Sequence, residues 1–260
     1  MLDLQQFASH DRPRIEAMVK GGELLGSIRD QLRELAVIGT TFETLESAAQ
    51  RLIAATGAKP SFSTVPGYHW ATCIMKNDAL CHGIPKNGIV KDGDIITIDV
   101  GLIYQGFHND TTITFAVGTV PKSTLNFLEI GKKSLADAIG AVRAGASVYD
   151  ISSAMEKPAK RAGFGLVMEL TGHGVGAHLH EAPNIPCTSY ASDKRVMLHA
   201  GQTIAVEIMY TMGSPFLTVD GDNWTFRTRD HSLSGMFEDT ILVTETGYEV
   251  LTKPSVTGIL

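Results

Sequence analysis

HGIP at residues 82–85 and GDIITID at residues 93–99 decide the fold, because the chain repeats both with changes as HEAP at 180–183 and GQTIAVE at 201–207. In each copy, histidine and proline are three positions apart, and glycine precedes the final acid by six. The spacer between the two pieces is ten residues longer in the second copy. Duplicated halves usually pack about a pseudo-twofold axis, so we expect the equivalent acids Asp99 and Glu207 to converge there.

Both acids end apolar, β-branched runs that are typical of buried strands. A buried carboxylate is costly unless a partner or a metal ion neutralises it. The duplication, with convergent acids and histidines, therefore favours a site for two metal ions.

Composition narrows the class of protein. The chain has 260 residues, of which 43% are hydrophobic and 19% charged, as in soluble globular proteins. A net charge of −6 gives no general electrostatic reason to bind nucleic acid or acidic lipid. Three cysteines without a C-x-x-C pair fit reduced thiols. The N-terminus lacks the apolar run of a signal peptide, and no apolar stretch reaches the roughly 18 residues of a membrane span. We expect a cytoplasmic protein.

Helices and strands are expected to alternate in groups. Apolar residues recur at helical spacing in residues 11–35, 43–56, 123–143 and 147–162, with Thr41 as an N-cap, Gly57 as a stop and a break near Pro158. Strand-like runs cover 94–103, 107–117, 165–170, 202–211 and 239–244. This order predicts an α+β fold in layers, not βαβ units. No Pro- or Ser-rich linker occurs, so we expect residues 1–260 to form one domain with intertwined halves, roughly 12–120 and 121–252.

Tyr104-Gln105-Gly106 predicts a hairpin with Asp99 on one strand and Asp110 on the other. A two-residue Gln105-Gly106 turn would set Asp99 opposite Thr112, with Asp110 as its diagonal neighbour on the same face. A four-residue turn would set the two acids directly opposite. In either register the carboxylates repel unless a cation lies between them. An exposed pair on an edge hairpin is the alternative, but the apolar run before Asp99 favours burial and metal.

A glycine-rich run at residues 172–180 contains three histidines. No P-loop lysine follows it, so a phosphate loop is not favoured. His178 and His180 would share a face on a strand, which leaves open a zinc site of the H-x-H type. The helical motif HExxH is absent, because Asn184 takes the place of its second histidine and Pro183 would interrupt a helix.

Other polar residues have ordinary interpretations. Glu238 and Asp239 come just before an apolar run, where an acid is most often a solvated strand end. His10, His69, His108, His178, His199 and His231 are expected to be ordinary surface or core histidines, with His69 near the rim of a pocket.

Taken together, these motifs resemble those of the methionine aminopeptidases, specifically the bacterial type I branch of the pita-bread metallopeptidases. The resemblance runs from about residue 12 to 252. Its motifs fall in the family's order at residues 81–85, 93–95, 98–100, 106–108, 110–112, 172–176, 180–183, 207, 224 and 232–238. It implies a pita-bread fold, in which two pseudo-twofold-related halves form a curved antiparallel sheet backed by helices. It also implies removal of N-terminal methionine from nascent proteins and peptides with a small second residue.

The resemblance implies a set of metal ligands, namely Asp99, Asp110, His173, Glu207 and Glu238. Four carboxylates and one imidazole suit two divalent ions such as Mn, Fe or Co, and Zn also fits. The catalytic residues implied are His82, His180 and Glu207. Glu207 would take part in proton transfer, His180 would contact the scissile amide, and His82 would bind the leaving side or shuttle protons.

The resemblance also implies how the substrate binds. The residues aligned with the family's pocket are Tyr68, Cys73, His82, Leu179, His180 and Trp224, and aromatic and sulfur contacts suit a thioether side chain. Core packing is the alternative for Cys73 and Leu179. Asn77 and Ser234 align with a site for one Na or K ion. The implied partners are nascent polypeptide N-termini, with the ribosome as one setting, and the implied state is a monomer that binds neither membrane nor specific nucleic acid.

Three departures from the family pattern concern substrate preference more than reaction class. Ile208 follows Glu207 where the family usually has proline, and Val65 replaces a frequent cysteine. The Tyr68–Cys73 loop looks shorter, and its Trp70 would narrow the rim of the pocket. Such departures fit an auxiliary copy of the enzyme in its host. The competing functions are another pita-bread hydrolase, such as an X-Pro aminopeptidase or dipeptidase, and a non-catalytic pita-bread binding protein.

Overall fold

A computed structural model describes residues 2–253 of the chain. Its α-helices are α1 (Arg12–Leu35), α2 (Phe42–Ala55), α3 (Lys122–Gly140) and α4 (Val148–Arg161), and short 3₁₀ helices cover Leu4–Gln6, Phe62–Thr64 and Ala191–Arg195. The strands are β1 (Lys59–Pro60), β2 (Thr72–Lys76), β3 (Ala79–Cys81), β4 (Ile95–Tyr104), β5 (Phe107–Ala116), β6 (Gly165–Leu166), β7 (Thr171–Gly174), β8 (Glu181–Pro186), β9 (Thr203–Thr211), β10 (Leu217–Val219), β11 (Phe226–Thr228), β12 (Ser234–Val243) and β13 (Tyr248–Val250).

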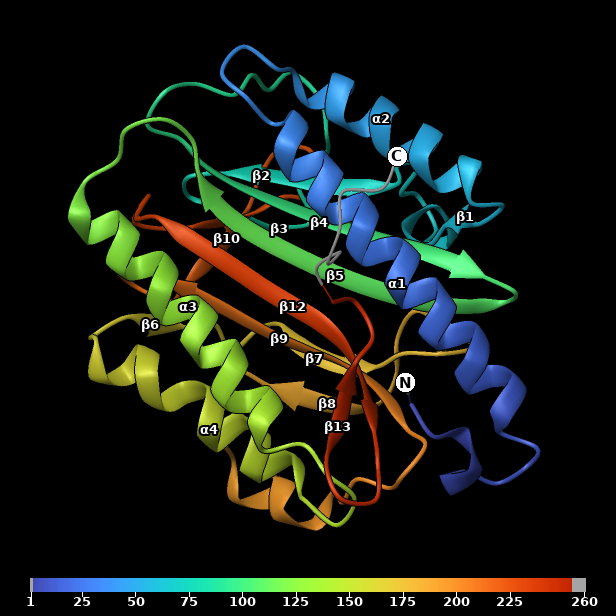
Figure 1. Cartoon of the computed structure of the whole chain (residues 1–260). Helices are drawn as coiled ribbons and strands as arrows, with labels where there is room; N and C mark the ends of the chain where they lie inside the picture. The colour runs from blue at the N-terminus through green and yellow to red at the C-terminus, as the bar shows by residue number, and fades with distance from the viewer. Residues whose placement is uncertain (1, 254–260) are drawn as a thin grey trace.

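The large sheet joins strands from both parts of the sequence. Its order is β1-β4-β5-β12-β9-β7-β8, with β2 paired to β4, β6 to β9 and β13 to β12. The hairpin β4–β5 therefore lies beside the pair β12–β9, and β5 meets β12 at the centre (Figure 1). A smaller sheet has the order β10-β11-β3. The described pairs are antiparallel, and the helices lie against the sheet, so the α+β expectation is confirmed.

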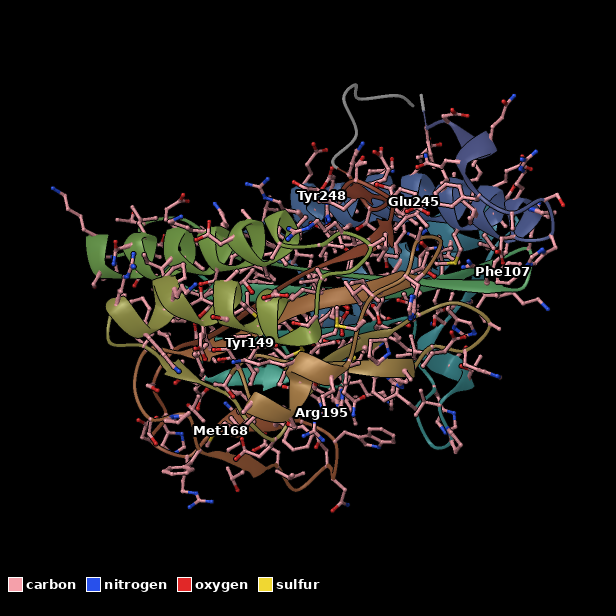
Figure 2. The ribbon with its side chains drawn as sticks, turned by 90° about the horizontal axis from the view of Figure 1, so that it is seen from below. Phe107, Tyr149, Met168, Arg195, Glu245 and Tyr248 are labelled. Atoms are coloured by element: carbon pink, nitrogen blue, oxygen red, sulfur yellow. The ribbon has the colours of Figure 1, made fainter. Side chains whose placement is uncertain are left out.

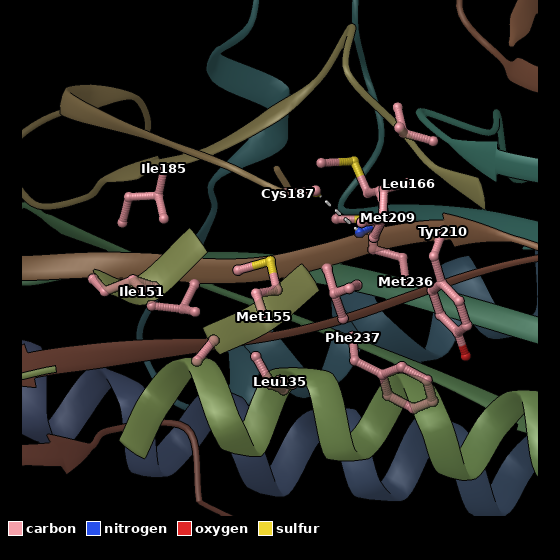
Figure 3. Packing of buried hydrophobic residues seen from close by; sticks show 14 of the residues in the cluster. Leu135, Ile151, Met155, Leu166, Ile185, Cys187, Met209, Tyr210, Met236 and Phe237 are labelled. Carbon is pink, nitrogen blue, oxygen red and sulfur yellow. Dashed lines mark hydrogen bonds between the residues drawn. The ribbon is translucent and has the colours of Figure 1, made fainter. Parts of the chain in front are cut away.

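Two apolar clusters hold the helices on the sheet. α1 and α2 pack over β4 through Leu25, Leu32, Leu45, Ile96 and Ile98. α3 and α4 pack over β9 and β12 through a second cluster, part of which Figure 3 shows: Leu135, Ile151, Met155, Tyr210 and Phe237. Alternation along each strand then leaves Asp99, Asp110, Glu207 and Glu238 pointing to the opposite face of the sheet.

Local signals explain several element boundaries. Thr41 caps α2 as expected, since its side chain accepts a hydrogen bond from the Thr44 N–H, and Gly57 beyond the helix has φ 76°. The hairpin turn has Gln105 at φ 49° and Gly106 at φ 89°, as a two-residue turn with two positive φ angles requires.

The hairpin register agrees with the two-residue turn. Asp99 pairs with Thr112 and Asp110 with Gly101, so the two acids are diagonal neighbours on one face. Both are buried, at 5% exposure, which excludes an exposed edge pair.

Three sequence expectations about elements are wrong. α4 continues through Pro158 to Arg161, so the missing proline N–H costs one intrahelical hydrogen bond without ending the helix, and the proline ring is buried. β12 begins at Ser234 and not at residue 239, so Glu238 lies inside a buried strand and is not a solvated strand end. The strand expected at 165–170 ends at Leu166, and the chain then turns into the site.

Among the described residues, no helix is long and apolar enough to cross a membrane.

Candidate active site

A cavity of about 260 Å³ lies on the face of the sheet that the helices leave free. Figure 2 shows Met168 on the side of the molecule opposite α1 and α3, and residues 169–171, which follow it, line the cavity. The other lining residues come from both halves of the sequence: Phe62, Val65, Tyr68, Cys73, Cys81, His82, Asp99, Asp110, His173, Leu179, His180, Glu207, Met209, Trp224, Met236 and Glu238. The five predicted metal ligands and the six predicted substrate-binding residues are all among them.

Four buried carboxylates and one imidazole meet at the floor of this cavity. One ligand atom each from Asp110, His173 and Glu238 lie within 4.8 Å of one another. Glu207 joins them, with its Oε1 3.7 Å from His173 Nε2. Asp99 is linked through Thr112, whose hydroxyl lies 2.9 Å from Asp99 Oδ1 and 2.8 Å from Glu238 Oε2. The structure thus brings the five residues together from β4, β5, β7, β9 and β12.

The cluster lacks the hydrogen bonds that buried oxygens normally have. Asp110 Oδ1 and Glu238 Oε1 are buried and have no hydrogen-bond partner among the described residues. Thr112 has one hydroxyl proton for two carboxyl oxygens. Buried oxygen atoms are rarely left unpaired, so their free lone pairs fit the presence of a cation.

The electrostatics of the protein alone oppose this arrangement. Burial raises the pKa of Asp99 to about 7. Burial and repulsion by neighbouring carboxylates raise the pKa values of Asp110, Glu207 and Glu238 well above their ordinary range. Opposite charge within a few ångströms would reverse these shifts, and divalent cations supply it.

His173 is prepared to act as a ligand. Its Nδ1 lies 2.9 Å from the Gly174 carbonyl oxygen, to which it donates, so Nε2 keeps a free lone pair toward the acids. Burial, with repulsion from His180, lowers the pKa of His173 to about 4, which keeps the ring neutral near pH 7.

Metal-free protein should lose stability as the pH rises from 6.5 to 8. A carboxyl group whose folded pKa is raised stabilises the fold fully below its unfolded pKa of about 4, and this contribution is lost as the pH rises through the folded value, about 7 for Asp99. The lowered histidine pKa values act in the opposite sense, but only below about pH 6.5. Thermal unfolding in chelator should therefore show a falling Tm above pH 6.5, and Mn²⁺ should remove that fall. Equal pH dependence with and without Mn²⁺ would contradict this electrostatic description.

Two histidines face the cluster from opposite halves. His180 packs edge-on against His173, with ring centroids 4.5 Å apart, and is exposed at the mouth. His82 has φ 55°, and its ring packs edge-on against Phe226. Burial lowers the pKa values of both rings, and proximity to His180 lowers that of His82 further. Both are thus neutral near pH 7, with one ring N–H to donate and one nitrogen to accept.

An apolar pocket adjoins the acids. Tyr68 meets Trp224 and Trp70 edge-on, each at a centroid distance of 5.1 Å, and Cys73 and Leu179 belong to the same buried cluster. Tyr68 is fixed by hydrogen bonds from its hydroxyl to the carbonyl oxygens of Thr72 and Gly83. The predicted pocket residues therefore form one surface. Cys73 and Leu179 are both packed in this buried cluster and also line the cavity, so the two interpretations apply together.

Trp70 and Val65 occupy different places around this pocket. Trp70 is not a lining residue, contrary to the expected rim position: it packs behind Tyr68, with Lys86 Nζ 5.1 Å from its ring centroid. Val65 does line the cavity. Ile208 is fully buried and pairs with Phe237, so it lies in the sheet next to Glu207.

Asn77 and Ser234, the residues predicted to hold a monovalent cation, lie side by side away from the cavity-lining set. The Ser234 N–H and hydroxyl both donate to the Asn77 carbonyl oxygen, at 2.9 and 3.1 Å. Asn77 Oδ1 accepts from the Ile95 N–H, and its Nδ2 donates to Asp94. The cation role stays a prediction.

Most of the remaining histidines agree with their ordinary interpretation. His108 is a buried residue hydrogen-bonded to Ser61, and His69 is exposed beside Trp70 and does not line the cavity. The H-x-H zinc alternative is wrong, because His178 and His180 lie in a bend between β7 and β8 and not on a strand.

Sequence reasoning missed several lining residues. Met209 and Met236 are two positions from Glu207 and Glu238, so strand alternation could have placed them on the same face. Thr171 in β7 is likewise two positions from His173, whereas Phe62 in a 3₁₀ helix and Glu169 and Leu170 between strands had no such signal. Thr112 was expected opposite Asp99, but its contact with Glu238 was not expected.

Comparison with known proteins places this site in a family. The sequence matches metallopeptidase family M24 over residues 16–245. It is 35% identical to methionine aminopeptidase 1 of Bacillus subtilis, over 91% of this chain and 95% of that protein. It is 36% identical to the methionine aminopeptidase of Buchnera aphidicola, over 89% and 88% of the two chains.

A solved structure of the methionine aminopeptidase from Thermotoga maritima superposes with a TM-score of 0.90 at 33% identity, covering 97% of this chain and all of that one. This likeness confirms the pita-bread fold that the sequence predicted. The chain belongs to metallopeptidase family M24 and, within it, to the methionine aminopeptidases.

Proposed function

We propose that this protein removes the N-terminal methionine from polypeptides with a small second residue, using two divalent ions held by Asp99, Asp110, His173, Glu207 and Glu238. The observation that carries this proposal is the meeting of Asp110, His173 and Glu238 ligand atoms within 4.8 Å, in a cavity that also contains an apolar pocket. Family membership supplies the reaction class, a metal-dependent aminopeptidase.

The donor set fits two divalent ions. Four carboxylates balance the charge of two dications, and oxygen-rich sites suit Mn, Fe or Co, with Zn also fitting. The unpaired oxygens of Asp110 and Glu238 are available to a metal, and the free Nε2 of His173 faces the same space. When bound, such ions polarise the scissile carbonyl and lower the pKa of a water molecule.

The side chains of the chain itself would divide the remaining work. The apolar surface of Tyr68, Cys73, Leu179 and Trp224 would hold the methionine side chain and exclude water from it. His180, neutral and exposed at the mouth, would donate its ring N–H to the scissile amide. His82 would bind the leaving side or move a proton, and Glu207 would accept and release a proton at its carboxylate.

A panel of peptides tests the substrate proposal. We expect release of methionine from Met-Gly, Met-Ala and Met-Ser peptides, and little from Met-Leu or Met-Lys. A change of one methylene in an apolar pocket alters discrimination by only about 1–3 kcal/mol, so norleucine and leucine in the first position should be cleaved partially. Peptide products would be quantified by mass spectrometry. Cleavage of X-Pro peptides without methionine, and of none of the Met-small set, would instead favour the X-Pro aminopeptidase alternative.

The cellular context belongs to the same proposal. Substrates would be the N-termini of nascent polypeptides in the cytoplasm, with the ribosome as one setting, and the protein would act as a monomer of one domain built from two halves. The non-catalytic alternative predicts loss of metal ligands, whereas the five ligand positions are intact and lie together.

A further inference from the structure

The central seam of the sheet, where β5 meets β12, differs from the pairings beside it. β4 and β5 pair residue by residue from Ile95–Ala116 to Tyr104–Phe107, and β12 pairs with β9 in the same continuous way. Between β5 and β12 the register pairs Glu238 with Thr112. This seam is also where the two halves of the sequence join (Figure 1).

On either side of that pair, a threonine hydroxyl forms hydrogen bonds with the backbone N–H and carbonyl groups of the facing strand. The Thr240 hydroxyl accepts from the Asp110 N–H at 3.0 Å and donates to the Asp110 carbonyl oxygen at 2.8 Å. The Thr114 hydroxyl does the same for Met236, at 2.9 and 2.6 Å. The two contacts are related by the pseudo-twofold symmetry, since each lies two residues from the Thr112–Glu238 pair. Both threonines are fully buried.

The two equivalent contacts hold residues with different tasks. Thr240 holds the backbone of Asp110, whose buried Oδ1 has no partner in residues 2–253. Thr114 holds Met236, which lines the cavity and carries no ligand atom that a hard divalent ion prefers. The Thr240 contact therefore holds a predicted metal ligand, and the Thr114 contact, of the same chemistry and burial, does not.

We propose that Thr240 is a positioning residue for the metal centre: its hydroxyl fixes the Asp110 backbone across the seam and so sets where the Asp110 carboxylate stands. This inference rests on the proposed function, because Asp110 is taken as a metal ligand. In the fully buried seam, loss of the hydroxyl would leave the Asp110 N–H and carbonyl oxygen without this partner, and the strand would shift to recover one. A ligand strand that shifts holds its metal less tightly.

The test compares Thr240→Val with Thr114→Val, since valine keeps the shape of threonine and removes the hydroxyl. Mn²⁺ is titrated into each metal-stripped protein by calorimetry. We expect the Mn²⁺ Kd of Thr240→Val to rise about 10- to 100-fold, the usual effect of losing a partner behind a ligand, and that of Thr114→Val to change less than threefold. The Thr114 hydroxyl also contacts the Thr97 hydroxyl at 2.8 Å. Thr114→Val therefore removes one more hydrogen bond than Thr240→Val, which makes it a strict control. Thr240→Ser keeps the hydroxyl and should retain wild-type affinity.

Amide hydrogen exchange of the metal-free proteins supplies a reading that does not depend on metal. The Asp110 amide should exchange faster in Thr240→Val, and the Met236 amide faster in Thr114→Val. Equal Mn²⁺ affinities of the two valine variants, or unchanged Asp110 exchange, would overturn the proposal. If Thr240→Val does not fold, a tenfold loss of affinity in Thr240→Ser would overturn it, and wild-type affinity there would support it. Wild-type protein that binds no Mn²⁺ would instead refute the proposed function, and Asp110 exchange would still test the contact.

Discussion

Asp110→Asn and Glu238→Gln should each remove bound metal and lower aminopeptidase turnover by at least about 10³-fold. Each change replaces a buried carboxylate oxygen that has no hydrogen-bond partner within the described chain. The neutral amide leaves too little negative charge for two dications, and metal assistance supplies several kcal/mol of catalysis, which corresponds to this factor. Metal content by elemental analysis and release of methionine from Met-Ala-Ser would be measured on the same preparations.

The same two variants should be more stable than wild type when metal-free. The four carboxylates raise one another's pKa values, so removing one charge relieves repulsion in the empty cluster. We expect a higher Tm than wild type in chelator and no gain in Tm from Mn²⁺. Asp94→Asn is the control, because Asp94 is also buried but contacts Lys76 and lies outside the cavity. Full metal content in Asp110→Asn would contradict the ligand assignment.

His180→Ala and His82→Ala should lower turnover about 10²–10⁴-fold while leaving metal content nearly unchanged. Both histidines line the cavity, where His180 contacts the His173 ring and His82 packs on Phe226. Neither belongs to the group of converging ligand atoms. Removing either one takes away a neutral ring that can donate or accept a proton at the scissile amide. Turnover would be measured at saturating Mn²⁺, so that a small change in affinity does not lower the rate.

Two other histidines serve as controls for these variants. His69→Ala and His178→Ala remove exposed imidazoles that do not line the cavity and should keep near wild-type turnover. If His180→Ala or His82→Ala instead empties the metal site, that histidine is a ligand and its proposed role is wrong.

Much of the site could be predicted because its residues lie on regular strands. The apolar run before Asp99 indicated burial, and the two-residue turn at Gln105 and Gly106 fixed the register that puts Asp110 on the same face. The repeat of the HxxP and G-x5-acid patterns predicted that Glu207 would converge on Asp99. In each case, a short-range pattern determined a long-range contact through the period of the strand.

The rest depended on tertiary contacts that no local pattern contains. The sequence predicted a solvated strand end at Glu238, because Glu238 and Asp239 precede an apolar run. Pairing of β12 with β9 and β5 instead buries Glu238. Thr114 and Thr240 are ordinary strand residues in sequence, and only the meeting of β5 and β12 turns their hydroxyls toward the partner backbone. Trp70 was expected at the pocket rim and packs behind Tyr68, since loop conformation is not set by periodicity.

The most direct test of the central claim is turnover of Met-Ala-Ser by rigorously metal-stripped protein during titration with Mn²⁺. We expect no release of methionine without metal, recovery as the first ion binds, and saturation of binding at two ions per chain. Within residues 2–253, no lysine or arginine lines the cavity, so the buried carboxylate cluster has no counter-charge there without metal. Full peptidase activity in the stripped protein, with less than one metal ion per ten chains, would contradict the central claim.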